Sequence, residues 1–153
     1  MASILMVAGE GLPFIKTGGL ADVIGSLPKA LTERGHEVKV VMPLYKKISD
    51  KYYNELHFDC EYSVSINYHE VPVRVFSKVV DNVCFFFIQH QGYFERDSLY
   101  GYQDDGERFG YFQKAVIEML NQLNYWPNII HCHDWHTGMI PCMVKETHDA
   151  DPR

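Results

Sequence analysis

Several features that would assign a protein to a definite class are missing from this sequence. No apolar run approaches the roughly 20 residues that a membrane-spanning helix needs. Residues 1–8 lack the basic start and the small-residue cleavage site of a signal peptide. Positive charge is not in excess, since 14 basic residues face 20 acidic ones and the formal net charge is −6. We therefore expect a cytoplasmic protein with no nucleic-acid and no membrane partner, in which any bound anion is held locally.

Cysteine pairs with metal-binding or redox spacing are also missing. The four cysteines, Cys60, Cys84, Cys132 and Cys142, are scattered and form no CxxC pair, so we expect them to be reduced residues of the core. The sequence does contain enough apolar material for one sizeable core, with 46% apolar residues in 153 positions. At this length a single domain over residues 1–153 is expected.

Strand-like and helical patterns alternate in the first third of the chain. Residues 3–8 are almost wholly apolar, as in a parallel strand buried on both faces. From Gly19 onward apolar residues recur at helical spacing until Arg34 and Gly35, a cation followed by a glycine cap. Residues 37–42 then predict a second buried strand, which completes a βαβ unit with a right-handed crossover.

The middle and the end of the chain predict two further kinds of element. Strands are expected over 61–68, 71–80 and 83–89, with a tight turn at Asp81 and Asn82. Residues 90–104 show no sustained period and predict a long ordered loop. A helix over 105–123, a strand over 128–133 and a helix over 137–145 follow. This order predicts an α/β fold: a doubly wound, mainly parallel Rossmann-like sheet with an inserted β-hairpin region.

Two polar segments are expected to meet at one edge of that sheet. Residues 9–19 and 131–136 each follow a predicted strand, and ligands of open parallel sheets bind at the carboxyl ends of the strands. Gly18 and Gly19, at the start of a helix, let the backbone approach a ligand, and the free N–H groups there favour an anion. Lys16 adds a point charge. An ordinary strand-to-helix turn explains the same three residues equally well.

The known nucleotide-binding loops do not fit this segment. The order Lys-Thr-Gly-Gly is reversed from that of nucleotide hydrolases, in which the glycines come before the lysine. A dinucleotide fingerprint also fails, because Phe14 occupies the position of its third glycine and Pro13 blocks an early helix. A nicotinamide-dependent oxidoreductase is therefore not expected.

Three histidines near the last strand raise the question of a zinc site. His131 and His133 share one face of the predicted strand, and His136 follows after a turn. They offer only three nitrogen ligands, and their spacing matches no zinc pattern, so no metal is predicted.

One long segment and several shorter ones resemble a known enzyme family. Residues 10–31, with the sequence EGLPFIKTGGLADVIGSLPKAL, resemble the N-terminal signature of bacterial glycogen synthases and plant starch synthases. Motifs similar to those of the same family follow in the same order, at residues 93–96, 99–101, 105–109 and 131–136. The resemblance implies one half of a two-domain, GT-B-type glycosyltransferase that moves glucose from ADP-glucose to the non-reducing end of an α-1,4-glucan, glycogen or starch, with retention. ADP-glucose is then the donor substrate, and no cofactor is expected.

The resemblance also assigns roles to individual residues. It implies that Lys16 and the backbone of Gly18 and Gly19 contact the diphosphate and the glucose of the donor. It places Asp22 in the donor or acceptor cleft, although an acid that stabilises the helix dipole is an equal alternative. Asp134 is implied as the catalytic residue facing the sugar, with His133 and His136 as substrate-binding residues.

Other positions are interpreted as structural or depart from the family pattern. Glu107 and Arg108 are read as a first-turn acid and an ion-pair partner rather than as catalytic groups. The family usually has asparagine where Gly106 stands, and other residues at Gly9 and Gly11.

Members of the resembled family are much longer and carry their nucleotide pocket in a C-terminal domain. The resemblance thus implies that residues 1–153 form a single N-terminal catalytic domain and that the missing C-terminal domain of the same polypeptide is its partner. The isolated chain is then inactive or nearly so, because one wall of a cleft does not preorganise the reaction. A non-catalytic glucan- or sugar-nucleotide-binding module is the alternative, and a metal hydrolase is a weaker one.

Overall fold

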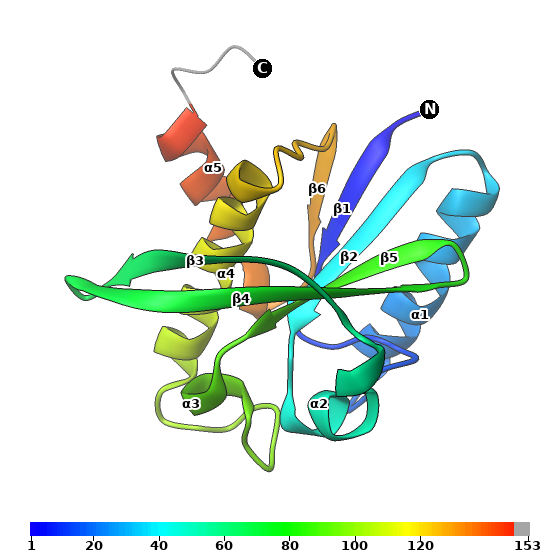
Figure 1. The fold of residues 1–153 in the computed structure, drawn as a ribbon. Coiled ribbons are helices and arrows are strands. Elements are labelled where there is room, and N and C mark those ends of the chain that lie inside the picture. Colours follow the sequence, from blue (N-terminus) through cyan, green and yellow to red (C-terminus); the bar gives the residue numbers. More distant parts are fainter. Residues whose placement is uncertain (149–153) are drawn as a thin grey trace.

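A six-stranded mixed sheet forms the centre of the computed structural model, which describes residues 1–148 (Figure 1). The strand order is β3-β4-β5-β2-β1-β6. Strands β5, β2, β1 and β6 are parallel, whereas β4 runs antiparallel to both β5 and β3. The strand bounds are β1 Ser3–Val7, β2 Glu37–Pro43, β3 His57–Ile66, β4 His69–Val80, β5 Val83–Gln89 and β6 Ile129–Cys132.

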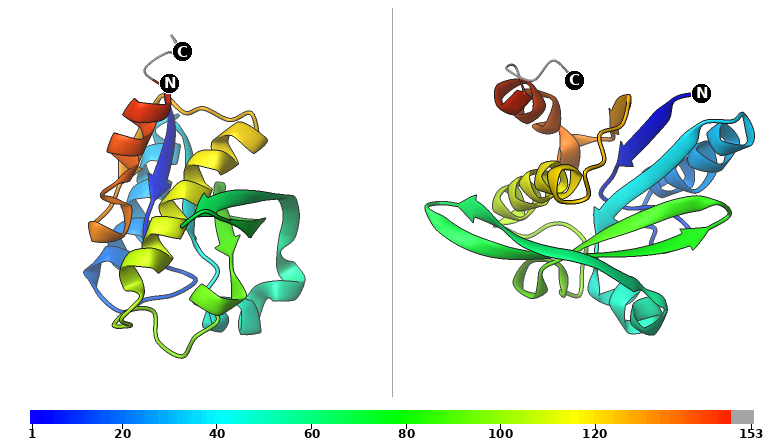
Figure 2. Two further views of the ribbon diagram at one scale, coloured as in Figure 1. Left: turned by 90° about the vertical axis from the view of Figure 1, so that its left-hand side faces the viewer. Right: turned by 45° about the horizontal axis from the view of Figure 1, so that its top comes forward.

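Helices cover both faces of the sheet. Helix α1 packs on one face, and α4 and α5 lie together on the other (Figure 2). The crossover through α1 leads from β1 to β2, and the one through α4 leads from β5 past β1 to β6, so the chain reverses its direction of winding between β1 and β6. The bounds are α1 Gly19–Glu33, α2 Lys46–Tyr52, η1 Tyr53–Glu55, α3 Gln91–Phe94, α4 Asp105–Gln122, η2 Trp135–Thr137 and α5 Ile140–His148. The predicted doubly wound fold is confirmed.

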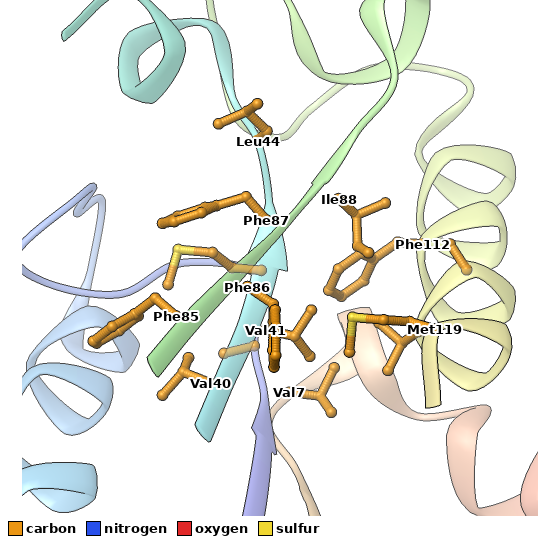
Figure 3. Packing of buried hydrophobic residues seen from close by; sticks show 14 of the residues in the cluster. Val7, Val40, Val41, Leu44, Phe85, Phe86, Phe87, Ile88, Phe112 and Met119 are labelled. Atoms are coloured by element: carbon orange, nitrogen blue, oxygen red, sulfur yellow. The ribbon is translucent and has the colours of Figure 1, made fainter. Parts of the chain in front are cut away.

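The core has two layers because the central strands are buried on both sides. In β5, Phe85 and Phe87 point to the side of α1, whereas Phe86 and Ile88 point toward α4 and its side chain Phe112 (Figure 3). Such near-continuous apolar strands are expected where helices cover both faces of a parallel sheet. None of the helices within residues 1–148 combines the length and apolarity that a membrane span requires.

Several predicted boundaries were wrong. The strand predicted over 61–68 runs instead as His57–Ile66, because Asn67 and Tyr68 turn the chain with φ values of 49° and 65°. The predicted turn at Asp81 and Asn82 is confirmed, with φ values of 51° and 63°. The loop predicted over 90–104 contains the short helix α3, and α2 with η1 was not predicted. In place of a helix over 137–145, η2 precedes α5.

The cysteines are all free, as predicted, but not all of them belong to the core. Cys142 is exposed on α5, because the helix turns this position toward solvent. Cys60, Cys84 and Cys132 are half-buried, and burial raises the pKa of each thiol. A raised pKa disfavours the reactive thiolate.

Gly11 and Ile24 fill complementary space beneath α1. A Cβ at position 11 would lie 2.8 Å from Cε of Met42 and closer still to Cγ2 of Ile24, which is fully buried. The replacement Gly11→Ala should therefore lower the free energy of unfolding by about 1–3 kcal/mol through overpacking. Ile24→Ala should cost less in the Gly11→Ala background than alone, because the new methyl group occupies part of the cavity.

Urea unfolding of the two single variants and the double variant measures this coupling. Gly106→Ala is the matched control, since nothing lies within 4 Å of a Cβ built at that position in α4. Additive losses from Gly11→Ala and Ile24→Ala would contradict the predicted complementarity.

Candidate functional site

The two predicted polar segments meet at the carboxyl edge of β1 and β6. These strands are neighbours, and the N–H of His133 donates to the carbonyl oxygen of Val7 at 3.0 Å. The imidazole of His136 lies on the backbone of Gly9, where an added Cβ would be 2.7 Å from its Cγ. The predicted juxtaposition is confirmed, and it falls at the point where the winding reverses, which is where open α/β sheets bind ligands.

The segment from Gly9 to Gly18, here called the glycine loop, is folded back on itself and anchored below. Gly11 and Ile15 form an antiparallel bridge, and the N–H of Leu12 donates to the carbonyl oxygen of Ala21 at 3.1 Å. The ring of Phe14 is held by three aromatic rings at centroid distances of 4.9–5.2 Å, those of Phe87, Phe85 and Tyr52. The loop is thus ordered by its own backbone and by buried side chains, of which Phe14 is the largest.

The glycine loop ends at an uncapped helix start. Gly18 is the N-cap of α1 and makes no side-chain capping bond, so the first N–H groups of the helix are available to a ligand. The ammonium group of Lys16 contacts both carboxylate oxygens of Asp22 at 2.7 Å, and both side chains are about half exposed. An exposed pair of this kind contributes about 0–1 kcal/mol, so an incoming phosphate can take over the ammonium group.

Asp22 lies in the first turn of α1, as predicted. Its carboxylate is the counter-ion of Lys16. Lys16, Gly18, Gly19 and Asp22 therefore converge on one exposed point at the start of the helix.

Asp134 has a strained backbone. Its φ of 63° and ψ of −176° lie in a region that is essentially restricted to glycine and costs about 1–3 kcal/mol. The carboxylate accepts the N–H of Trp135 at 2.7 Å, and the hydroxyl of Thr137 donates to the carbonyl oxygens of His133 and Asp134 at 3.0 and 3.1 Å. Such strain clusters at functional sites, and here it presents an exposed carboxylate beside the glycine loop.

The histidines separate into two environments. His136 is 2% exposed, neither of its ring nitrogens has a hydrogen-bond partner among the described residues, and burial lowers its pKa. His133 packs instead against His131, with ring centroids 4.0 Å apart. Within residues 1–148 no group of three or more histidine, cysteine or acidic side chains is arranged to hold a metal ion.

Glu10 is a polar residue of the site that the sequence interpretation gave no role. It is 4% exposed, and its carboxylate accepts hydrogen bonds from both the N–H and the hydroxyl of Thr17. Tyr45, which follows β2, also contacts the site, and its hydroxyl donates to the carbonyl oxygen of Gly9. The available signal was an acid three positions after a buried strand.

Arg108 organises the segment between α3 and α4 from within. It is fully buried, its Nε donates to the carbonyl oxygen of Tyr93 at 2.7 Å, and its Nη1 donates to that of Leu99 at 3.2 Å. It also pairs with Asp105, which confirms the structural reading of this arginine. Glu107 accepts a hydrogen bond from the Tyr93 hydroxyl rather than pairing with Arg108.

Comparison with known proteins decides the family. The sequence model of the starch synthase catalytic domain matches residues 3–153. The chain belongs to the starch synthase catalytic domain family. Among curated relatives of this starch synthase domain, the glycogen synthase of Clostridium kluyveri is 47% identical over 142 residues, which are 93% of this chain and 30% of the relative. That of Streptococcus agalactiae serotype III is 46% identical over 143 residues, which are 94% of this chain and 30% of the relative.

A solved structure agrees with the sequence comparison. The catalytic domain of Starch Synthase IV from Arabidopsis thaliana, bound to ADP and acarbose, superimposes with a TM-score of 0.87 at 32% identity, over 97% of this chain and 31% of that one. The chain thus spans about 30% of the length of the curated relatives that it matches. The predicted family and fold of this starch synthase domain are confirmed.

The starch synthase domain should lose stability in mild acid because of His133. Burial, with a smaller effect of His131, lowers the pKa of His133 from 6.5 to about 4. The unfolded chain then binds the proton more strongly, so the stabilisation is complete above about pH 6.5 and declines as the pH falls toward 4. We expect a loss of about 1–2 kcal/mol over this range, since the side chain is half-exposed and solvent screens part of the effect.

Urea unfolding of the wild type and His133→Asn between pH 4 and 7 measures this contribution. The free energy of unfolding should depend less on pH in His133→Asn, whereas His69→Asn, at an exposed position on β4, should behave like the wild type. Parallel pH profiles of the wild type and His133→Asn would contradict the prediction.

Proposed function

We propose that this chain is the N-terminal domain of a glycogen or starch synthase, which transfers glucose from ADP-glucose to the non-reducing end of an α-1,4-glucan with retention. The observation that carries the proposal is the uncapped start of α1, with Lys16 beside it, at the sheet edge that also presents Asp134. The similar plant enzyme whose structure was solved with ADP and acarbose supports the ligand class. The site of action is the cytoplasm.

The groups at this edge match the charges that develop in such a transfer. Breaking the glucosyl–phosphate bond leaves negative charge on the departing diphosphate while the sugar becomes oxocarbenium-like. The ammonium group of Lys16 and the N–H groups at Gly18 and Gly19 stabilise the leaving diphosphate, since preorganised cations and amides lower such a barrier. Once Lys16 turns to the phosphate, the Asp22 carboxylate is free to accept a hydrogen bond from a hydroxyl of the sugar donor or of the acceptor glucan.

Residues 131–136, at the end of β6, are assigned to binding the sugar of the donor. In this proposal the carboxylate of Asp134 faces the glucosyl unit, and the strained backbone fixes its direction. His136 is assigned to the same sugar site, and its two ring nitrogens are buried and have no hydrogen-bond partner among the described residues. His133 supports the same loop through its carbonyl oxygen and contacts substrate at the rim. No cofactor is assigned, because ADP-glucose supplies the activated sugar as a substrate.

The proposal includes a second domain across the cleft. The curated relatives are about three times as long as their match to this chain, which covers 30% of each. We assign the nucleotide base and the remaining donor contacts to that additional part of the polypeptide. The chain by itself is then expected to bind donor weakly and to transfer glucose at a negligible rate.

Calorimetry with ADP, ADP-glucose and maltoheptaose tests the proposal on the purified chain. Lys16→Ala should weaken ADP binding by about 10- to 100-fold, because a hydrogen bond to a charged group contributes about 1.5–3 kcal/mol. Lys16→Arg should retain part of the affinity, and Lys47→Ala, an exposed lysine on α2, should leave it unchanged.

Three results would change the assignment. ADP affinity that survives Lys16→Ala would contradict the phosphate contact. Binding of maltoheptaose without any binding of ADP or ADP-glucose would favour a non-catalytic glucan-binding module. Transfer from labelled ADP-glucose to glycogen by the chain alone, at an ordinary enzymatic rate, would contradict its dependence on a second domain.

A further inference from the structure

Glu10 is a buried acid that the proposed chemistry does not use. It stands three positions after the end of β1 and is 4% exposed. Its two oxygens lie 3.0 and 2.9 Å from Oγ1 of Thr17, and the N–H of Thr17 also donates to it. One carboxylate therefore accepts hydrogen bonds from both donors of Thr17, and it joins the two ends of the glycine loop.

Because of this contact, no side chain caps the start of α1. Thr17 is the hydroxyl residue nearest to the helix start, and its side chain is turned back to Glu10 instead. Gly18 has no side chain to cap the helix, and the carboxylate of Asp22 is occupied by Lys16. A Cβ at Gly18 would lie 3.9 Å from a Glu10 oxygen, so the carboxylate is also close to the N-cap position of α1.

The buried carboxylate of Glu10 is compensated by hydrogen bonds and not by a cation. Among the ion pairs of residues 1–148 none includes Glu10, because Lys16 is directed to Asp22. Burial is the main cause of the raised pKa of Tyr45, to which the charge of Glu10 adds a minor contribution, and burial lowers the pKa of His136, an effect that Asp134 and Glu10 oppose. A buried carboxylate without a cation costs several kcal/mol unless hydrogen bonds compensate it, and Thr17 supplies them.

We propose that Glu10 is a positioning residue: by holding Thr17 from below, it keeps the ammonium group of Lys16 and the uncapped amides of α1 directed at one point, where the diphosphate of the donor binds. This inference rests on the proposed function for the identity of the ligand. Glu10 touches neither the donor nor the acceptor and acts through Thr17.

Amide hydrogen exchange without ligand tests whether Glu10 holds the loop. In Glu10→Ala the Thr17 amide should exchange at least about 10-fold faster than in the wild type, because its acceptor is gone. Glu10→Gln keeps the shape and one acceptor oxygen, so it should restore most of the protection. Glu33→Ala, an exposed glutamate in the last turn of α1, is the matched control and should leave Thr17 unchanged.

Titration with ADP tests the consequence for binding. The dissociation constant should rise about 10-fold in Glu10→Ala and much less in Glu10→Gln, since the rescued hydrogen bond restores the loop. If Glu10→Ala does not fold, Thr17→Val replaces it: removal of the hydroxyl donor should weaken ADP binding, whereas Thr17→Ser keeps both donors and should bind like the wild type.

The outcomes separate this inference from the proposed function. Unchanged Thr17 exchange in Glu10→Ala, or ADP affinity that neither Glu10→Ala nor Thr17→Val alters, overturns the role of Glu10 while Lys16 can still bind the donor. Wild-type ADP affinity in Lys16→Ala overturns the donor contact, and the exchange of Thr17 still decides whether Glu10 holds the loop.

Discussion

Arg108→Met should lower the free energy of unfolding by about 3–5 kcal/mol, which is the usual cost of removing one partner of a buried ion pair. The guanidinium group is fully buried and joins the carbonyl oxygens of Tyr93 and Leu99 to the carboxylate of Asp105. Methionine fills a similar volume but leaves these acceptors without a donor. Urea unfolding followed by circular dichroism measures the loss.

The charge of Asp105 accounts for part of this expected cost. Adding Asp105→Asn to Arg108→Met should recover some stability, because the uncompensated charge is removed. Arg34→Met, at the exposed C-cap of α1, is the control and should change stability little. A loss in Arg108→Met no larger than in Arg34→Met would show that the buried network does not support the fold.

Phe14→Ala should cost about 3–5 kcal/mol, the range measured for buried aromatic residues, and should also weaken ADP binding. Phe14 ties the middle of the glycine loop to the rings of Phe85, Phe87 and Tyr52. Its removal leaves a cavity under the loop, and the loop then loses the order that directs Lys16 to its ligand. Thermal unfolding and an ADP titration on the same variant report both effects.

Two further variants separate packing from binding. Phe14→Leu fills most of the space and should retain ADP affinity at a smaller cost in stability. Phe58→Ala, at a position that is 45% exposed, should lose less stability than Phe14→Ala and should bind ADP normally. Normal ADP affinity in a folded Phe14→Ala protein would contradict the anchoring role of this residue.

Local patterns explain which elements were predicted correctly. The strand, helix and strand of the first βαβ unit were predicted because an apolar run and a helical period are visible in the sequence itself. The turn at Asp81 and Asn82 was predicted for the same reason, since both residues tolerate positive φ. The short helices α2 and α3 were missed, because few turns of helix carry too little periodicity to be distinguished from a loop.

In the candidate site, too, the residues with a local sequence signal were predicted, and those positioned by tertiary contacts were missed. Lys16, Gly18 and Gly19 were predicted as an anion site because a helix start with glycines and a lysine has a local chemical meaning, and this role stays a prediction. Glu10 was missed because its partner Thr17 is reached only after the loop has folded back. The strain at Asp134 was equally invisible, since no sequence pattern demands a φ of 63° at an aspartate.

The sequence by itself determined the fold class, the family and the chemical character of the glycine loop, since these depend on residue order and local spacing. Only the tertiary structure decided that Lys16 pairs with Asp22, that Glu10 holds Thr17, and that His136 lies on Gly9. These contacts join residues from different strand ends or from opposite sides of one loop. Their geometry follows from the parallel pairing of β1 with β6 and from the packing beneath the loop, which no local pattern encodes.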